Sequence, residues 1–581
     1  MSSMQRTKKW VRVPLSLSVS ALVVFLFATT GSASVSRQHS SDATGFGSNW
    51  TVYHQDPLGQ GVDPSGTDLS PASAAWTSAT LDGQIFGEPL VYAGRVVVAT
   101  ENDTIYELAA NTGATIWSTH IGTAVPSGDL PCGDISPTVG ITGTPMIDPS
   151  TDKIFVVTDE LVDSAPQHYM VGLDLDTGAV LLHQAIGLPG SDQAAQLQRP
   201  GLALDDGNVV AGFGGNAGDC GTYHGWIVSI PEGGGAQQTF EVASLTNDNQ
   251  GAVWMGGAAP EIDSANDIWF ATGNSAYQSS GDTYDNSDGV IELNSQLAEL
   301  QYFTPTTWPS DNASDYDLGS SSPAFVDNGL VFQAGKSQTA YVMSKSSLGG
   351  VGGQLTEATG YCGNDVDGGY AVVGDIVYTP CESGVVATEV APGTPPTISS
   401  LWRTSTGSGG PPIVAGGLVW TINHNNGTLY GLDPSTGDAS QTFSLGSVAN
   451  HFPTPTVSDG LLLAASSSAV HAFDGPAGLP PAPTGTGVSI TTTSLPGATP
   501  GHLYKVQLDA TGGETPYRWQ LVAGSGTPPK GVGLHADGLL AGTPRNRDAA
   551  GDYTFTVRVS THKVGHQQVQ TATQQLTLDL A

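Results

Sequence analysis

Positive charge is scarce in this chain. Its 581 residues include 18 lysines and arginines against 53 aspartates and glutamates, which gives a formal net charge of −35. A surface of this sign repels phosphate backbones and anionic lipid headgroups. The composition therefore speaks against a nucleic acid partner and suits a protein that is soluble outside the cell.

Long apolar runs are absent after the N-terminus. Four basic residues precede an apolar stretch from Leu15 to Ala28, and the small residues Gly31-Ser32-Ala33 follow. This pattern predicts a secretory signal peptide over residues 1–33 and a flexible segment over 34–48. An uncleaved anchor is the alternative, but the run is short for a membrane span. We expect a secreted or cell-surface protein with no membrane span after cleavage.

Cysteine is also rare. The chain has four cysteines, with no Cys-x-x-Cys pair and no Cys/His cluster that would indicate zinc. An even number in an exported protein suggests two disulfides, for which three pairings exist. Cys362 and Cys381 fall within one repeat of the sequence, so we predict that they pair and leave Cys132 with Cys220.

Glycine and proline are abundant, and short β-branched runs alternate with turns. One template recurs: a proline near a strand, a Gly/Asp/Asn turn, a β-branched strand, then a strand that ends in a Thr-Gly turn. About eight copies follow one another at intervals of roughly 40 to 65 residues. The chain is therefore predicted to be all-β, with a propeller of about eight blades over residues 49–476. Asn49–His54 is expected to complete the last blade and close the ring.

The pattern changes after the last repeat. Residues 477–487 are a Pro/Gly/Thr linker. Residues 488–581 contain alternating strands and are predicted to form a small Ig-like β-sandwich. The stretch from Gly533 to Val559 resembles Ig-like domains that are appended to bacterial surface and secreted proteins, which act as spacers or bind polymers and surfaces.

Three segments carry a more specific resemblance: "LAANTGATIW" from Leu108, "LDLDTGAVLL" from Leu173 and "LDPSTGDAS" from Leu432. They are similar to the repeat of the quinoprotein alcohol dehydrogenase-like propellers, and the resemblance covers about residues 45–475. That fold carries pyrroloquinoline quinone dehydrogenases and also non-enzymatic scaffolds of outer-membrane assembly. The resemblance is therefore specific for the fold and much less so for the function.

The resemblance implies a quinone site. Trp254 matches the tryptophan on which the quinone stacks, and Lys336 matches a lysine that binds a quinone carbonyl. Asp315 and Asp317 lie where the family has its catalytic base. A flat ring suits stacking, a carboxylate accepts the proton of an alcohol, and an ammonium group stabilises the reduced cofactor.

The resemblance also implies a calcium site. Asn274 matches an amide ligand of calcium, Asp315 is a further candidate ligand, and Glu160 is the nearest candidate for the upstream glutamate. Calcium is a hard cation that prefers such oxygen ligands, and it would polarise the quinone carbonyl.

Three features of the dehydrogenases are missing. Cys132 is followed by Gly133 where the family has two adjacent cysteines, Ser136-Pro137 stands where an arginine is usual, and no Cys-x-x-Cys-His motif could attach haem. The sequence thus favours a secreted, monomeric binding or scaffold module for an extracellular protein or polysaccharide. The alternative is a dehydrogenase of small alcohols or sugars that uses pyrroloquinoline quinone and calcium.

Overall fold

The structure is a computed structural model. It describes residues 49–279, 281–404, 406–407, 409–449, 452–458, 460–476, 488–511, 516–522, 525–547, 549–561 and 571–581. The predicted signal peptide, the segment 34–48 and the linker 477–487 lie outside these residues. Among the described residues, no helix is long and apolar enough to cross a membrane.

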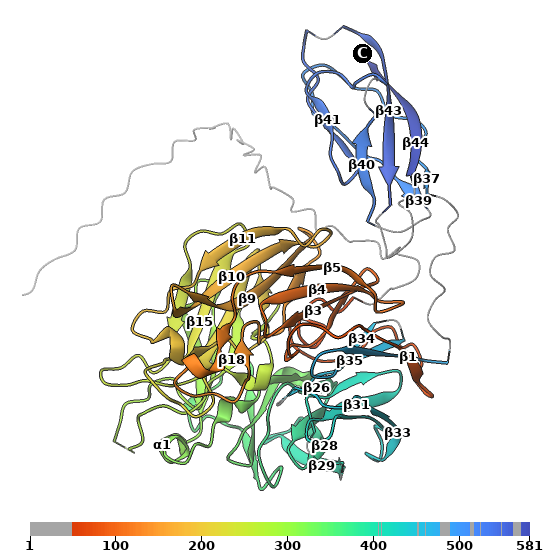
Figure 1. Ribbon diagram of the computed structural model, residues 1–581. Coiled ribbons are helices and arrows are strands. Elements are labelled where there is room, and N and C mark those ends of the chain that lie inside the picture. Colours follow the sequence, from red (N-terminus) through yellow and green to blue (C-terminus); the bar gives the residue numbers. More distant parts are fainter. Residues whose placement is uncertain are drawn as a thin grey trace, which may run out of the picture. The chain divides into compact units, whose positions relative to one another are not determined.

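The described part of residues 49–476 is built from eight sheets of four or five strands, which we number in chain order (Figure 1). Neighbouring strands are antiparallel except for β24, which joins sheet 4 in parallel. Sheets 1 and 2 contain β2 (Leu90–Tyr92), β3 (Arg95–Thr100), β4 (Thr104–Ala109) and β5 (Thr115–His120), then β8 (Met146–Asp148), β9 (Lys153–Val162), β10 (Ala165–Asp174) and β11 (Val180–Ala185). Sheets 3 and 4 contain β12 (Gln196–Leu197), β13 (Ala203–Asp205), β14 (Asn208–Gly215), β15 (Trp226–Pro231) and β16 (Gln238–Glu241), then β17 (Glu261–Ile262), β18 (Ile268–Ala271), β19 (Val290–Leu293), β20 (Glu299–Thr304) and β24 (Gly350–Val351).

The later sheets repeat this arrangement. Sheets 5 and 6 contain β21 (Ala324–Val326), β22 (Leu330–Ala334), β23 (Thr339–Ser344) and β25 (Thr356–Thr359), then β26 (Ala371–Val373), β27 (Ile376–Cys381), β28 (Gly384–Ala391) and β29 (Thr397–Arg403). Sheets 7 and 8 contain β30 (Ile413–Ala415), β31 (Leu418–Asn423), β32 (Thr428–Leu432) and β33 (Ala439–Ser444), then β34 (Thr456–Ser458), β35 (Leu461–Ala465), β36 (Val470–Asp474) and β1 (Ser73–Thr77).

Few other elements occur. A hairpin of β6 (Val125–Pro126) and β7 (Thr138–Val139) lies between sheets 1 and 2. The helical elements of the described residues are α1 (Trp308–Asn312), η1 (Ser127–Asp129), η2 (Gln193–Ala195), η3 (Met255–Gly257), η4 (Leu318–Ser320) and η5 (Asp327–Gly329).

Sheet 8 combines strands from both ends of the repeat region. Its outer strand is β1, which pairs with β36. The expectation that Asn49–His54 supplies this strand is therefore wrong. That segment instead runs past the first strands of several sheets: Trp50 exchanges both backbone hydrogen bonds with Val91 of sheet 1, and Thr51 accepts one from Ile147 of sheet 2.

Neighbouring sheets are fastened by a repeated contact between a tryptophan and a Thr-Gly turn. The indole N–H donates to a carbonyl of the next sheet's turn, and the ring lies against the turn glycine, where a Cβ would come within 2.5 Å of the ring. These glycines have positive φ, so only glycine satisfies both the turn and the contact. The three pairs are Trp76–Gly113, Trp117–Gly178 and Trp402–Gly437.

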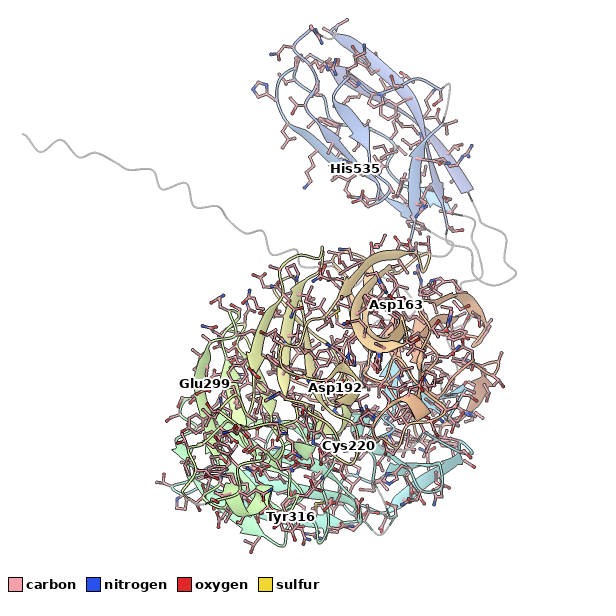
Figure 2. All side chains as sticks on the ribbon, turned by 60° about the vertical axis from the view of Figure 1, so that its left-hand side comes forward. Asp163, Asp192, Cys220, Glu299, Tyr316 and His535 are labelled. Carbon is pink, nitrogen blue, oxygen red and sulfur yellow. A yellow bond between two sulfur atoms is a disulfide. The ribbon has the colours of Figure 1, made fainter. Side chains whose placement is uncertain are left out.

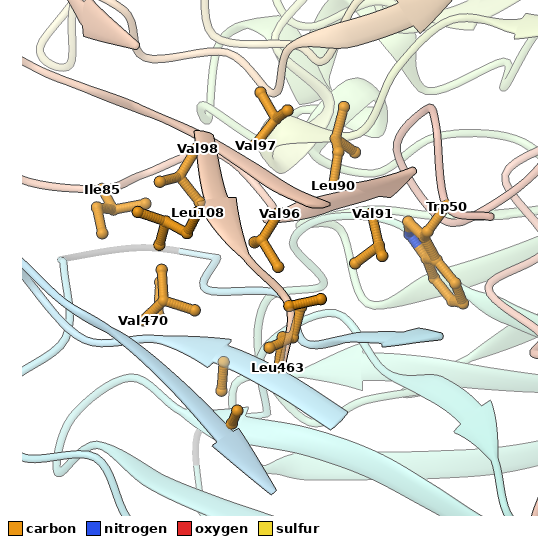
Figure 3. Packing of buried hydrophobic residues seen from close by; sticks show 14 of the residues in the cluster. Trp50, Ile85, Leu90, Val91, Val96, Val97, Val98, Leu108, Leu463 and Val470 are labelled. Atoms are coloured by element: carbon orange, nitrogen blue, oxygen red, sulfur yellow. The ribbon is translucent and has the colours of Figure 1, made fainter. Parts of the chain in front are cut away.

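The first and last sheets share one apolar core. Val96 and Leu108 of sheet 1 belong to the same cluster of buried side chains as Leu463 and Val470 of sheet 8 (Figure 3). The inner strands of each sheet bury both faces against neighbouring sheets, which is why strands such as β3 and β35 are continuous β-branched or leucine runs. Outer strands such as β5 and β11 alternate in burial instead.

The C-terminal region has a core of its own. It contains β37 (Ser489–Ile490) with β39 (Ala510–Thr511), the sheet of β38 (Tyr504–Gln507), β42 (Leu539–Gly542) and β41 (Val532–Leu534), and the sheet of β40 (Arg518–Leu521), β43 (Gly551–Ser560) and β44 (Thr571–Leu580). Leu540 of one three-stranded sheet and Phe555 of the other lie in the same cluster of buried side chains.

Candidate functional site

The repeat region has a pocket of about 350 Å³. Its lining comes mainly from the turns that join the second and third strands of sheets 3 to 6, and from the connections between successive sheets. Because these turns gather at the same ends of the sheets, residues more than three hundred positions apart in the chain line one cavity.

Five of the six residues that sequence comparison assigns to a cofactor or metal line this pocket. They are Trp254, Asn274, Asp315, Asp317 and Lys336. Trp254 precedes η3 in the connection from sheet 3 to sheet 4 and is half-buried. The Lys336 ammonium lies 5.2 Å from the centroid of its ring, and the Phe452 ring lies 5.8 Å from it at an angle of 46°.

The two aspartates proposed as the base have different environments. Asp317 is buried, accepts the Asn274 backbone N–H at 2.7 Å and pairs with Lys336 at 2.6 Å. The Asp315 side chain is 63% exposed and lies 3.6 Å from Lys336. Asp317 is therefore held in place by fixed partners, whereas Asp315 remains open to a molecule that enters the pocket.

The charges of this group are coupled. Burial and then the neighbouring Asp317 raise the pKa of Asp315 above its ordinary value, while Lys336 opposes the change. Burial lowers the pKa of Lys336, but Asp317 outweighs this effect and the net pKa is raised. Lys336 consequently stays protonated at every pH at which the protein would work.

Glu160 does not line the pocket, so the structure does not bring this predicted calcium ligand to the other site residues. It lies in β9, accepts a hydrogen bond from Thr158 and contacts His183 Nε2 at 2.7 Å. A carboxylate that does line the pocket is Asp219, in the loop between β14 and β15. The family resemblance implies a glutamate as this ligand and gives no reason to single out Asp219. The available sequence signal was Cys220, which directly follows Asp219.

Asp219 lies close enough to Asp315, Asp317 and Lys336 for their charges to change its pKa. Burial raises the pKa of Asp219, Asp317 and Asp315 raise it further, and Lys336 opposes them. Tyr223 donates a hydrogen bond to the Asp219 carboxylate and so orients it. Asp219, Asn274 and Asp317 together offer hard oxygen donors to the pocket.

A disulfide links two of the loops that line the pocket. The predicted pairings are confirmed, with Cys132 bonded to Cys220 and Cys362 to Cys381. Cys132 lies in the β6–β7 hairpin, and Figure 2 shows Cys220 within the repeat region. Both neighbours of this bond, Asp134 and Asp219, are lining residues. The chain lacks adjacent cysteines but has a long-range disulfide beside its pocket.

Further lining residues were not foreseen from the sequence. The Arg199 guanidinium lies over the rings of Phe86 and Phe452, at 5.7 and 5.2 Å from their centroids, and burial lowers the pKa of Arg199 to about 10. Seven acidic residues line the pocket against two basic ones, Arg199 and Lys336. The acidic residues are Asp134, Asp219, Asp315, Asp317, Asp365, Asp367 and Glu382.

Repeated antiparallel sheets with strand-joining turns around one pocket define the class of the repeat region as a β-propeller. Comparison with known proteins is more specific. The family model described as "Outer membrane protein assembly factor BamB" matches residues 67–218 and 305–443, and a family model of Ig domains matches residues 486–578. The chain belongs to the PQQ-repeat β-propeller family and carries a C-terminal Ig-like domain.

Solved structures with the same fold include two quinohemoprotein alcohol dehydrogenases, from Pseudomonas putida HK5 and Comamonas testosteroni. Each has a TM-score of 0.54 and 14% identity, over 77% of this chain and 83% of the other. A europium-containing methanol dehydrogenase has a TM-score of 0.54 and 11% identity, over 74% of this chain and 98% of the other. No curated protein matches the chain.

Proposed function

We propose that this protein is an exported dehydrogenase that binds calcium and pyrroloquinoline quinone in the pocket and oxidises a small alcohol or sugar. The observation that supports this proposal is the convergence of Trp254, Asn274, Asp315, Asp317 and Lys336 in one cavity. The sequence alone favours a binding or scaffold role; this convergence reverses the order of the two hypotheses.

The donor set suits a hard cation. Asp219, Asn274 and Asp317 would hold it, because carboxylate and amide oxygens are the ligands that calcium prefers. Asp317 already positions the Asn274 backbone through its hydrogen bond, so the two ligands move as a unit. Asp219 replaces Glu160 in this set.

The aromatic and basic residues suit a flat quinone. Trp254 would support the ring system, and Lys336, held by Asp317, would face its polar edge. When bound, calcium and the quinone supply Lewis acidity and two-electron oxidation. Asp315 would then accept the hydroxyl proton of the substrate, because it is exposed at the cavity and its raised pKa suits a general base.

Other parts of the fold support the setting of this activity. We take the eight sheets as eight blades of a ring that β1 closes, since β1 joins the N-terminal end of the repeat region to its last sheet. We take the C-terminal sheets as an Ig-like sandwich around one core. Two disulfides are typical of an exported protein. The solved structures of similar fold include alcohol dehydrogenases.

Binding and turnover test the proposal separately. The chelator-treated full chain is mixed with calcium and pyrroloquinoline quinone, binding is followed by tryptophan fluorescence, and turnover by dye reduction with alcohols and sugars. We expect calcium-dependent quinone binding at micromolar concentration, weakened about tenfold or more in Trp254→Ala by lost stacking. Absence of binding in the wild type would overturn the dehydrogenase proposal.

Asp315→Asn is expected to bind the quinone and lose dye reduction, since the amide accepts no proton. Asp206→Asn is the matched control: Asp206 is likewise a non-glycine residue with positive φ in a turn, and it is exposed and does not line the pocket. Equal turnover in the two variants would remove Asp315 from the mechanism.

The scaffold hypothesis has one specific support, the family model, which is described as an assembly factor of the outer membrane. In this case the chain presents the propeller surface to an extracellular protein or polysaccharide. Quinone binding would be absent from the wild type, and a polysaccharide array probed with the full chain would give binding that Trp254→Ala leaves unchanged.

A further inference from the structure

Three of the pocket carboxylates lie together on one wall, and none of them is among the residues assigned above. Asp365 and Asp367 are in the connection from β25 to β26, and Glu382 is in the turn between β27 and β28. One oxygen of each residue lies within 4.8 Å of the others. Two ligands of one calcium ion, each bonded at about 2.4 Å, are at most that far apart.

The chain holds these like charges close together. The Cys362–Cys381 disulfide joins the segment before Asp365 to the residue before Glu382. The Glu382 backbone N–H donates to the Asp365 carbonyl at 3.0 Å, and the Asp367 N–H donates to Pro380 at 3.3 Å. These links hold together the two backbone segments that carry the three carboxylates.

Two side-chain oxygens at this wall are buried and have no hydrogen-bond partner: Asp367 Oδ1 and Asn364 Oδ1. The Asn364 amide already donates to Glu382 at 3.3 Å, so its oxygen is held beside the same carboxylates. A buried oxygen without a partner is unfavourable, so two of them beside three carboxylates point to a bound cation.

A second group of three acidic residues has a lysine beside it that offsets part of its negative charge. Asp263, Asp267 and Glu292 are equally close to one another, but Lys345 lies 2.9 Å from Asp263. At the pocket wall the neighbouring lysine, Lys336, is already paired with Asp317 at 2.6 Å. Among the described residues these are the two acidic groups of this closeness, and only the second group has a lysine of its own.

We propose that Asp365, Asp367 and Glu382 bind a divalent cation such as calcium, with the side-chain oxygen Oδ1 of Asn364 as a further ligand. This site is separate from the cation site of Asp219, Asn274 and Asp317. Its metal would offset the excess of carboxylates in the pocket, which otherwise opposes an anionic cofactor. That role rests on the proposed function, whereas cation binding at the wall does not.

Calcium binding without any quinone tests the site. Isothermal titration of the chelator-treated full chain with calcium is expected to show two ions per chain. Asp367→Asn combined with Glu382→Gln should remove one of them, because the amides carry no charge to attract the ion. If the double variant fails to fold, Glu382→Gln alone is the second variant, because Glu382 is exposed. It should weaken the affinity for that ion at least tenfold.

Asp267→Asn with Glu292→Gln is the matched control at the group that Lys345 neutralises, and it should keep both ions. Unchanged calcium binding in the Asp367/Glu382 and Glu382 variants would overturn the wall site. If the wild type binds two calcium ions but no quinone, the proposed dehydrogenase is overturned and the wall site stands.

Discussion

Replacing Asp103 tests most directly how a buried carboxyl group makes the free energy of unfolding depend on pH. It lies in the turn between β3 and β4, is fully buried, and neither of its carboxyl oxygens has a hydrogen-bond partner. Burial and then Glu160, Asp159 and Glu101 raise its pKa to about 9. Glu160, expected to bind calcium, thus belongs instead to a buried group of acids around Asp103.

The sign of the effect follows from where the proton is held. A carboxyl whose folded pKa is raised keeps a proton that the unfolded chain releases above pH 3.8, so stability falls as the pH rises from 3.8 towards 9. Each pH unit in this window costs about 1.4 kcal/mol, which amounts to about 4 kcal/mol between pH 5 and pH 8. Asp103→Asn has the same shape, carries no titrating group and escapes this loss.

Urea unfolding of the full chain at pH 5 and pH 8 measures the difference. The advantage of Asp103→Asn over the wild type should grow by about 4 kcal/mol between the two pH values. Asp163→Asn is the control, because Asp163 has the same φ of 51° in the corresponding turn of sheet 2, between β9 and β10, but is exposed (Figure 2). If Asp103→Asn follows the wild type in parallel across this range, Asp103 does not keep a proton in the folded state and the reasoning fails.

Two further predictions concern how the ring is held together. Trp76→Ala removes the contact of β1 with Gly113 and the hydrogen bond to Ala110, and calorimetry should show a loss of about 2 kcal/mol, or about 2 °C in Tm for a repeat region of this size; an unchanged Tm would mean that β1 does not fasten sheet 8 to sheet 1. Replacing both Cys132 and Cys220 by serine frees a loop closed across 88 residues, and urea unfolding should show a loss of about 4 kcal/mol. Equal stability of the serine variant and the oxidised wild type would contradict this loop-closure argument.

Much of this fold can be predicted from local patterns. The Thr-Gly turns require glycine because a positive φ and an indole ring meet there, so Gly113 and Gly178 are visible in the sequence as a repeat. The disulfide pairing follows from the positions of the cysteines within the repeats. Trp254 and Lys336 could be proposed as cofactor-site residues because each stands at a fixed place in such a repeat, and both line the pocket.

Other residues could not be assigned in this way. Glu160 lies near the end of β9 and Asp219 follows β14, and only the packing of the sheets shows that Asp219 lines the pocket while Glu160 joins Asp103. The sequence pattern predicts that Asn49–His54 completes sheet 8, whereas β1 does so in the structure, because both segments have short strand-like patterns near the start of the repeats. Sequence spacing does not say which of them pairs with β36.

The sequence by itself indicated the strands, the repeat and the residue types of the proposed cofactor site, because each depends on the chain within a few residues of itself. The disulfide pairing came from the places of the cysteines within the repeats. The tertiary structure decided which of those residues share a cavity and which are buried together. It placed Asp365 and Asp367 beside Glu382, and Asp103 beside Asp159 and Glu160. Charge, burial and repulsion between such groups depend on distances across sheets, and only the folded chain sets those distances.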